Sequence, residues 1–388
     1  MKPMQSNNSI VFLGTQMEVA GAQRMLLSQA RWFQKKGFVV QAVFFYDKQG
    51  LSEGWQAANT FPVISLEARM PNANPFSNAG RLMRAFWRLF RLLKNNQVII
   101  TFTPHSNLLG LPIAWLAGVS VRIGTHHGYI EGSSKLLAWF HGRLSNSKIC
   151  SKMVAVSNQV KEYAIMREHV NPEKIIVIQN GIEPHRLVKE QATMRQVLRN
   201  QFHVAESDLL VVTVGRFTVQ KGHTFLIDAI SQIAPRYPKV HFVFAGDGPL
   251  RQELEGKVKS LGLITRITFP GIRNDINELL LASDIFVQPS LWEGLSLALL
   301  EALMAGLPVL ATQVEGVADV VVDGKSALFV PPGDSERLAA ALEKLMQDPE
   351  LRSKLSKQGR ERAEKSYSID SMCNYYFQLI RNLLPDAS

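Results

Sequence analysis

The segment QPSLWEGLSLALLEALMAGLPVLAT, residues 288–312, decides the fold. A run at 284–287, apolar after its first residue Asp284, precedes it and predicts a short buried strand that ends at Pro289 and Ser290. A helical pattern begins at Ser296, a favourable N-cap residue, and Gly306 and Pro308 are its stop signals. A strand, a loop and a helix in this order predict a unit of a parallel α/β sheet.

Two carboxylates, Glu293 and Glu301, lie in this segment. On an ideal helix they would be roughly 80° apart, but Glu293 precedes the helix and can turn towards its N-terminus. The backbone amides of Gly294, Leu295 and Ser296 at that terminus are suited to a phosphate. The spacing alone also fits a buried helix in which a neighbour caps Glu301.

The N-terminal half opens with an apolar run at 9–13, then a loop that contains Gly14 and Gly21, a helical pattern up to residue 36 and a second strand at 38–45. This order is typical of a doubly wound parallel sheet. The loop lacks both G-x-G-x-x-G and G-K-[ST], so neither a dinucleotide site nor an ATP site is predicted. Its glycines either allow a tight turn or let a ligand approach the backbone.

Adjacent histidines, His126 and His127, follow the strand predicted at 121–124. Ligands of α/β proteins bind at the carboxyl ends of strands, so a role in a site is favoured over a structural role. No cysteine or further histidine lies nearby at metal-ligand spacing, and no zinc site is predicted.

Two cations, Arg216 and Lys221, lie five positions apart across a predicted strand-to-helix turn. A guanidinium offers a planar fork and an ammonium a mobile point charge, so together they can bind one anion. The alternative is a pair of solvated surface charges.

These motifs resemble the family 4 retaining glycosyltransferases. The shared segments are VAGAQR at 19–24, THHG at 125–128, NGI at 180–182, GRF-x₃-KG at 215–222 and the glutamate pair. The resemblance implies α/β domains of the GT-B fold, two doubly wound Rossmann-like domains that face a cleft. Residues 1–185 would bind the acceptor, 186–368 would bind the donor, and a helix at 369–388 would return to the first domain. Ala20, Gln23 and the pair Ala318-Asp319 depart from the family pattern.

The resemblance also implies a reaction, the transfer of a sugar from a nucleotide-diphosphate sugar to an acceptor hydroxyl with retention of configuration. Arg216 and Lys221 would stabilise the leaving diphosphate, together with the amides of Gly294–Ser296. Glu301 would bind the ribose and Glu293 the donor sugar, with a chemical role for Glu293 left open.

In the acceptor domain the resemblance places a histidine beside the transferred sugar, and the position before Gly128 favours His127 over His126. It also makes Gly14 and Gly21 substrate-binding candidates. No D-x-D occurs in the sequence, so a metal-independent enzyme without a cofactor is expected.

Charge is divided unevenly along the chain. Residues 1–180 hold 20 Lys and Arg against 8 Asp and Glu, whereas residues 181–388 hold 23 against 25. A basic half can serve nucleic acid, an anionic membrane or a phosphorylated substrate. The two cysteines, Cys150 and Cys373, are far apart and predict no disulfide framework, and the first residues do not read as a signal peptide, so we expect a cytoplasmic location.

One helical pattern, Arg81–Lys94, combines basic and apolar faces. Five cations fall on one arc of roughly 140°, and Trp87 lies among them rather than on the apolar side. Tryptophan beside arginine suits lipid headgroups, so a peripheral position on the inner face of a membrane is one hypothesis. The other is an ordinary packed surface helix.

Three other classes stay open at this point: a sugar-nucleotide epimerase or phosphorylase of the same fold, a nucleic-acid-binding protein, and a dehydrogenase. The missing G-x-G-x-x-G fingerprint disfavours the dehydrogenase, and no nucleic-acid-binding motif accompanies the basic half. An acceptor in lipopolysaccharide, capsule or other envelope polysaccharide synthesis is expected. The sequence does not identify the base, the sugar or the linkage.

Overall fold

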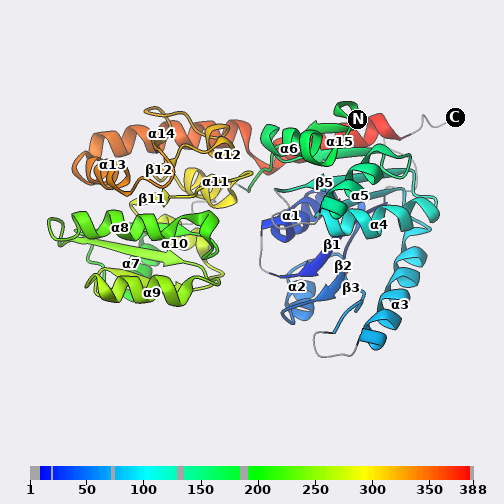
Figure 1. The fold of residues 1–388 in the computed structure, drawn as a ribbon, viewed down its shortest axis with the longest axis horizontal. Coiled ribbons are helices and arrows are strands. Elements are labelled where there is room, and N and C mark those ends of the chain that lie inside the picture. The colour runs from blue at the N-terminus through cyan, green and yellow to red at the C-terminus, as the bar shows by residue number, and fades with distance from the viewer. Residues whose placement is uncertain (1–8, 19–20, 71–74, 129–134, 184–190, 385–388) are drawn as a thin grey trace. The chain divides into compact units, whose positions relative to one another are not determined.

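The chain divides into two compact units (Figure 1). The computed structural model describes residues 9–18, 21–70, 75–128, 135–183 and 191–384. Unit 1 comprises residues 1–181 with 369–388, and unit 2 comprises residues 182–368. The division therefore falls four residues before the expected boundary at 185, and the C-terminal segment belongs to unit 1.

Unit 1 is built on a seven-stranded, fully parallel sheet with the order β3-β2-β1-β4-β5-β6-β7. Its inner strands are apolar runs, and residues 10–13 of β1 are completely buried. Continuous apolar strands are expected where helices cover both faces of a parallel sheet. The strands are β1 (Ser9–Met17), β2 (Val39–Asp47), β3 (Val63–Ser65), β4 (Val98–Phe102), β5 (Val121–His126), β6 (Lys152–Ala155) and β7 (Ile175–Val177).

The helices of unit 1 connect consecutive strands of the sheet, apart from α15, which is the last element of the chain. Among the described residues of the chain, no helix combines the length and apolarity needed to cross a bilayer. The helices are α1 (Gly21–Lys35), α2 (Ser52–Ala57), α3 (Pro75–Leu93), α4 (Pro104–Leu116), α5 (Lys135–Asn146), α6 (Asn158–Glu168), η1 (Pro172–Lys174) and α15 (Ile369–Leu383).

The position of Gly14 corrects the sequence interpretation. The strand β1 continues to Met17, so Gly14 lies inside a strand and not in a loop. A Cβ atom at Gly14 would lie 2.6 Å from the ring of Phe44, which packs there from β2. The glycine is required for sheet packing, and Gly14 is therefore not used in the site proposed below. Gly21 is the exposed first residue of α1.

The last helix, α15, packs on unit 1. Trp32 on α1 donates a hydrogen bond from Nε1 to Asp370 Oδ1 at 2.6 Å, and the rings of Phe38 and Phe377 meet edge to face at 6.1 Å. The phenol of Tyr376 is fully buried, and this burial raises its pKa. The C-terminal helix is thus an integral part of the first unit.

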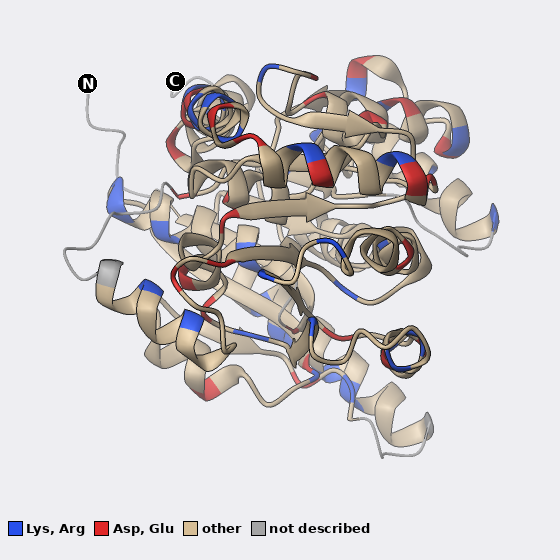
Figure 2. Ribbon diagram, turned by 90° about the vertical axis from the view of Figure 1, so that its left-hand side faces the viewer, with Lys and Arg blue, Asp and Glu red and all other residues tan. Residues whose placement is uncertain are grey.

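Unit 2 repeats the design with six parallel strands in the order β10-β9-β8-β11-β12-β13. In the ribbon of Figure 2, positions of Lys and Arg alternate with positions of Asp and Glu along its helices, in keeping with the nearly equal numbers of the two charges in this half of the sequence. The strands are β8 (Leu209–Val214), β9 (Val240–Ala245), β10 (Ile267–Gly271), β11 (Ile285–Gln288), β12 (Val309–Thr312) and β13 (Leu328–Val330). The helices are α7 (Gln191–Gln201), η2 (Val219–Lys221), α8 (His223–Ile233), α9 (Arg251–Ser260), α10 (Ile276–Ala282), α11 (Leu297–Met304), α12 (Glu315–Ala318), α13 (Ser335–Gln347) and α14 (Pro349–Ser366).

Both sheets have the doubly wound strand order, so the predicted pair of Rossmann-like α/β domains is confirmed. In each sheet the strand that comes first in the chain, β1 or β8, lies in the interior of the sheet. The direction in which successive strands are added reverses between β1 and β4 and between β8 and β11. Ligands of such sheets bind where the order reverses, outside the carboxyl ends of the two diverging strands. In unit 2 these are the ends of β8 and β11.

Candidate active site

The two cations predicted as an anion clamp follow β8. Arg216 is exposed, and its guanidinium makes no hydrogen bond or ion pair with any described residue. Lys221 ends the short helix η2, and its aliphatic stem lies over Gly215. Gly222 follows with a φ of 63°, and a Cβ atom there would lie 2.1 Å from the carbonyl oxygen of Pro289. The turn after β8 therefore packs directly on the end of β11.

Glu293 lies beside this clamp. Its carboxylate is buried, and Oε1 accepts hydrogen bonds from Lys221 Nζ at 2.5 Å, Ser290 Oγ at 2.7 Å and Gln288 Nε2 at 3.4 Å. A buried carboxylate needs such partners, because desolvation disfavours an unpaired charge. The sequence assigned Lys221 and Glu293 to different parts of a ligand, whereas the structure brings the two side chains into direct contact.

The loop that carries Glu293 is fixed at both ends. Ser296 is the N-cap of α11, as predicted: its Oγ accepts from the amide of Leu299 at 3.3 Å and donates to Gln288 Oε1 at 2.8 Å. At Gly316, a Cβ atom would lie 2.4 Å from the carbonyl oxygens of Glu293 and Gly294, so glycine lets α12 approach. Gln288, Ser290 and Gly316 were not predicted, because their roles depend on tertiary packing.

The N-terminus of α11 opens beside the clamp residues. None of the amides of Gly294, Leu295 and Ser296 donates a hydrogen bond to another described residue. Glu301, one turn further along α11, is 4% exposed. Because β8 and β11 are paired neighbours, these groups gather at the point where the strand order of unit 2 reverses. Free amides and cations together favour an anionic ligand.

A buried histidine, His223, begins α8 directly after the clamp. Its ring lies edge to face with Phe217 at 4.9 Å and near Phe244 at 5.7 Å. Burial, and then the positive charge of Lys221, lowers the pKa of His223 to about 3. The imidazole is therefore neutral near pH 7 and adds no charge to the clamp.

In unit 1, His127 follows β5 and is partly buried. Its ring stacks on Phe102, with centroids 5.3 Å apart, and its Nε2 lies 2.9 Å from Thr125 Oγ1. The Thr125 hydroxyl donates a hydrogen bond to the carbonyl oxygen of Thr101 at 2.8 Å, so it accepts the hydrogen bond from His127. His127 therefore carries its proton on Nε2, and its Nδ1 has the lone pair. Burial, and then the neighbouring His126, lowers the pKa of His127 to about 3. At neutral pH this histidine is a neutral acceptor.

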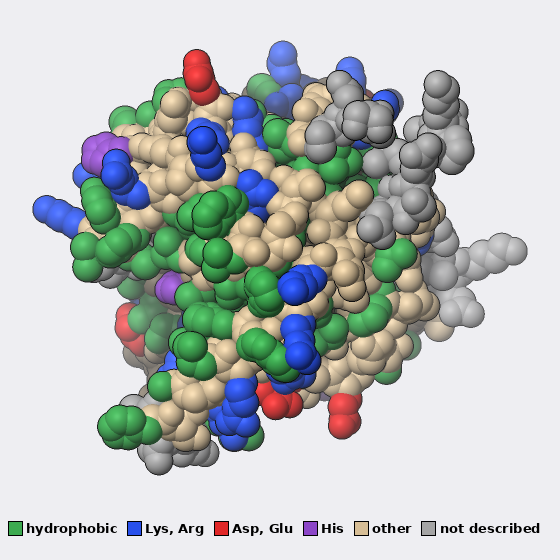
Figure 3. All heavy atoms as spheres, turned by 90° about the vertical axis from the view of Figure 1, so that its right-hand side faces the viewer, with side chains coloured by type: hydrophobic (Ala, Val, Ile, Leu, Met, Phe, Trp, Pro, Cys, Tyr) green, Lys and Arg blue, Asp and Glu red, His purple; other side chains and the backbone are tan. Residues whose placement is uncertain are grey.

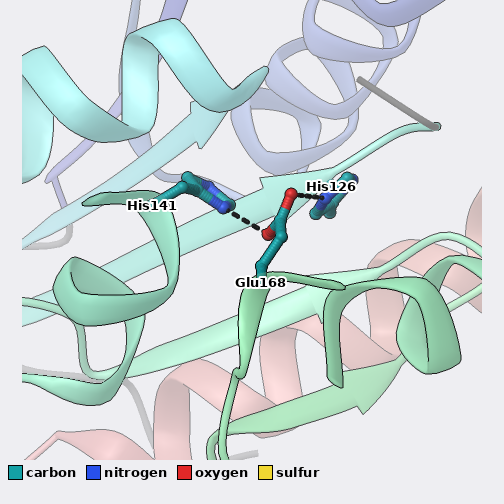
Figure 4. A group of neighbouring side chains, drawn as sticks. All are labelled: His126, His141 and Glu168. Carbon is teal, nitrogen blue, oxygen red and sulfur yellow. Dashed lines mark hydrogen bonds and ion pairs between the residues drawn. The ribbon is translucent and has the colours of Figure 1, made fainter. Parts of the chain in front are cut away.

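His126 has a different environment, completely buried between helices (Figure 4). Glu168 lies between two histidines: Oε1 is 3.1 Å from His126 Nε2, and Oε2 is 2.7 Å from His141 Nδ1. Burial alone would raise the pKa of Glu168, but hydrogen bonds from His126 and His141 outweigh it and lower the pKa to about 2. His126 thus ties β5 to α5 and α6, whereas His127 is the histidine that is accessible.

The donor atoms of His126, His141 and Glu168 lie within 4.8 Å of one another, close enough for a metal ion. Spacing along the chain did not predict this cluster, because its members come from three different elements. Asn107 Nδ2 donates to the carbonyl oxygen of Thr125 at 3.0 Å, which fixes the orientation of the amide, and it also lies 2.9 Å from His141 Nε2. His141 therefore accepts at Nε2 and carries its proton on Nδ1, so no lone pair faces Glu168. The cluster is a hydrogen-bonded network.

Two family models match the chain, one in each half. The model described as Glycosyltransferase Family 4 matches residues 19–186, and the model described as Glycosyl transferases group 1 matches residues 194–362. The chain belongs to the family 4, group 1 glycosyltransferases. The comparisons support this class over the epimerase, phosphorylase, dehydrogenase and nucleic-acid-binding alternatives.

Curated relatives of this glycosyltransferase include enzymes of bacterial surface polysaccharides. It is 29% identical to the UDP-Gal:alpha-D-GlcNAc-diphosphoundecaprenol alpha-1,3-galactosyltransferase of Escherichia coli, over 77% of this chain and 80% of the relative. It is 34% identical to the lipopolysaccharide core biosynthesis glycosyltransferase LpsE of Rhizobium meliloti, over 44% of this chain but only 49% of the relative.

Solved structures agree on the fold. HepE of Anabaena in complex with UDP-glucose superimposes with a TM-score of 0.84 at 21% identity, over 96% of this glycosyltransferase and 99% of HepE. WaaG, a glycosyltransferase of lipopolysaccharide biosynthesis, gives a TM-score of 0.73 at 20% identity, with 96% and 99% of the two chains covered. The predicted GT-B fold is therefore confirmed.

Proposed function

We propose that this glycosyltransferase transfers a sugar from a nucleoside diphosphate sugar, with retention of configuration, to a hydroxyl of a lipid-linked saccharide in cell-envelope polysaccharide synthesis. The observation that carries the proposal is the grouping of Arg216, Lys221 and Glu293 beside the free amides of α11. This grouping lies where ligands of doubly wound sheets bind. Unit 2 is then the donor-binding domain and unit 1 the acceptor-binding domain.

In the proposed reaction the diphosphate leaves with a growing negative charge. The exposed guanidinium of Arg216 and the ammonium of Lys221 bind its oxygens, and the amides of Gly294–Ser296 add fixed dipoles. Glu293 holds Lys221 in place, so this charge is positioned before the donor arrives. The cations and amides supply the stabilisation that a metal ion provides elsewhere, and the proposal needs no metal.

The two glutamates have separate roles in this proposal. Glu301 accepts hydrogen bonds from the ribose hydroxyls, and Glu293 orients the donor sugar. Oε1 of Glu293 already accepts three hydrogen bonds, one of them from a cation, and these partners lower its nucleophilicity. This favours a positioning role for Glu293 over covalent attack on the sugar.

His127 of unit 1 is proposed to contact the transferred sugar. Its neutral ring offers the Nδ1 lone pair, which accepts a hydrogen bond from a sugar hydroxyl and gives no attraction to a phosphate. His126 is committed to Glu168 and is left out of the site. Gly21, at the start of α1, stays a candidate for contact with the acceptor.

We further propose that the enzyme works at the cytoplasmic face of a membrane, with α3 as an attachment surface. The side chains of Ala85, Leu89 and Leu93 on this helix are buried. Arg84, Arg88 and Arg91 on the helix, and Lys94 directly after it, are exposed. Trp87 is 54% exposed beside these cations, with the Arg91 guanidinium 3.6 Å from its ring centroid. Arg81 is only partly exposed. Each cation near an anionic leaflet contributes about 1 kcal/mol.

A donor panel tests the proposed function. UDP-, GDP- and ADP-sugars are compared by thermal shift, and then by transfer to a polyprenyl diphosphate saccharide with NMR assignment of the product anomer. The E. coli relative is described as using UDP-Gal, so a UDP-sugar is the first candidate and an α-linked product is expected. An inverted product contradicts retention. Failure of all three nucleotide sugars to shift the unfolding temperature contradicts the donor site.

A further inference from the structure

A second group of exposed apolar side chains lies on the helices next to α3. Trp115 and Leu116 end α4, and Leu136, Trp139 and Phe140 lie on α5. Each of the five exposes 48% or more of its surface. The helix α4 packs against both α3 and α5, so these residues extend the exposed surface of α3 across two more helices.

This surface is unusual for a soluble protein. The helix α4, PHSNLLGLPIAWL, contains no Lys, Arg, Asp or Glu, although its C-terminal end faces solvent. Surface helices normally carry charged residues on the side that faces water. Several exposed apolar side chains on neighbouring helices indicate a contact site for a membrane or for another macromolecule. The five residues, together with Met83 and Trp87 of α3, form what we call the α3–α5 face.

Every ionic charge on the three helices is positive. The sequences of α3, α4 and α5 contain no Asp or Glu, while Lys135 and Arg143 on α5 join the exposed cations of α3. Figure 3, which faces this side of the chain, shows hydrophobic and basic side chains together and few acidic ones. The Arg143 guanidinium lies 5.7 Å from the Trp139 ring centroid, which repeats the pairing of Arg91 with Trp87.

We propose that the α3–α5 face docks on an anionic lipid bilayer, with the apolar residues of α4 and α5 inserted at the boundary between headgroups and acyl chains. Tryptophan paired with arginine suits the headgroup layer, where an apolar ring and a charge are both stabilised. Leu116 and Leu136 are aliphatic and offer no stacking surface to a nucleic acid base, so lipid fits them better. The complementary charge is that of acidic phospholipids.

Insertion of apolar residues predicts a different salt dependence of membrane binding from attachment through the cations of α3 alone. A purely electrostatic surface releases its membrane near 1 M salt, where the Debye length is about 3 Å. Apolar insertion does not depend on ionic screening, so part of the binding persists at high salt. The face is also close in sequence to the proposed acceptor site, because α5 begins eight residues after His127. The inference rests on the membrane attachment proposed above but not on the donor chemistry, because docking is measured without donor or acceptor.

The test is co-sedimentation of the full chain with phosphatidylglycerol–phosphatidylcholine vesicles, at low salt and near 1 M. The variant Leu116→Ser/Phe140→Ser keeps the tryptophans as reporters and is expected to lose the salt-resistant binding. It is also expected to lose the quenching of tryptophan fluorescence by brominated acyl chains. The variant Arg84→Gln/Arg91→Gln/Lys94→Gln is expected to weaken binding at low salt by about tenfold or more.

Matched controls lie elsewhere on the surface. Lys344→Gln/Lys354→Gln/Lys357→Gln removes three exposed cations of unit 2, and Ile264→Ser/Tyr375→Ser removes two exposed apolar side chains. Both controls are expected to bind vesicles like the wild type, and circular dichroism checks that every variant folds. Several results overturn the proposal: no binding of the wild type at low salt, complete release near 1 M, or equal binding by the Leu116→Ser/Phe140→Ser variant. Tighter binding to duplex DNA at equal phosphate concentration also overturns it.

Discussion

The side chain of Lys221 is shared between Glu293 and the proposed diphosphate. A lysine held by a buried carboxylate cannot move far, so its charge is fixed where the proposed leaving group would develop charge. Arg216 has no such partner among the described residues and is free to close on a ligand. The two cations therefore differ in pre-organisation, although both are proposed to bind one anion.

Removal of either cation tests this arrangement. We expect Arg216→Ala and Lys221→Ala each to lower turnover by roughly 10²–10³, the cost of losing one stabilising group in a dry site. Steady-state kinetics measure the loss. Because Lys221→Ala also leaves the Glu293 carboxylate buried without its cation, it is expected to lower the unfolding temperature as well. Near-normal turnover in either variant would remove that residue from the proposed mechanism.

The two glutamates are proposed to bind different parts of the donor, so their variants should have different effects. Glu301→Ala is expected to weaken nucleoside diphosphate binding by roughly 10- to 150-fold, because a hydrogen bond to a charged group is worth about 1.5–3 kcal/mol. Glu293→Gln keeps the shape of the side chain and should lower turnover more than nucleotide affinity. Calorimetric titration of the free nucleotide separates these effects. Equal nucleotide affinity of Glu301→Ala and the wild type would contradict the ribose assignment.

At the scale of elements, the site depends on two turns packed against each other at the ends of β8 and β11. Gly222→Ala places a Cβ atom against the Pro289 carbonyl and keeps a left-handed φ. The backbone conformation alone costs about 1–2 kcal/mol, and the clash adds to it. We expect unit 2 to be destabilised and turnover to fall, since Lys221 must move. Thermal unfolding and kinetics measure both.

Gly256→Ala is the matched control, because Gly256 is an exposed residue of the helix α9 with open space at its Cβ. This substitution should stabilise unit 2 by about 0.4–1 kcal/mol and leave turnover unchanged. If Gly222→Ala behaved like Gly256→Ala, the packing of the two turns would not support the site.

The sequence predicted the elements that local patterns determine. The strands predicted at 38–45 and 284–287 lie within two residues of β2 and β11, and the N-cap at Ser296 was correct, because strand and cap signals are local. Glycine was less informative: Gly14 suggested a loop, yet it serves the packing of Phe44 inside β1. In the sequence alone, a glycine that close packing requires cannot be distinguished from a glycine that a turn requires.

The relation between side chains of different elements was not predictable from one sequence. Asn107, His141 and Glu168 lie on three helices, and nothing in their spacing links them to His126. The same holds for Ser290 and Gln288 as partners of Glu293. The motifs named candidate residues for a site, but the neighbours that position these residues follow from the tertiary fold.

At the scale of the whole molecule, each unit holds a neutral histidine that resists protonation. His127 in unit 1 and His223 in unit 2 have pKa values lowered to about 3, whereas an unfolded histidine titrates near 6.5. Between these pH values the unfolded chain binds protons that the folded chain does not. Stability is therefore lost as pH falls below 6.5, at about 1.4 kcal/mol per pH unit for each proton.

The network around Glu168 adds to this loss at lower pH. The pKa of Glu168 is about 2 in the folded protein and 4.5 in the unfolded chain. The contribution of Glu168 to stability is therefore complete above pH 4.5 and is lost as pH falls towards 2. All three groups act in the same direction, and unit 1 contains two of them. We therefore expect both units to unfold at lower temperature at pH 5 than at pH 7.5, with unit 1 losing further stability below pH 4.5.

Calorimetry of the wild type and of His223→Phe checks this expectation. Phenylalanine fills the space between Phe217 and Phe244 and cannot be protonated, so the unfolding temperature of unit 2 should become less dependent on pH between 6.5 and 4.5. Because the two units can unfold separately, each transition is assigned by adding UDP, which should shift the transition of unit 2 if this unit binds the donor as proposed. If the unfolding temperature of unit 2 in His223→Phe depended on pH as in the wild type, His223 would be protonated in the folded protein. The assignment of a neutral histidine beside Lys221 would then be wrong.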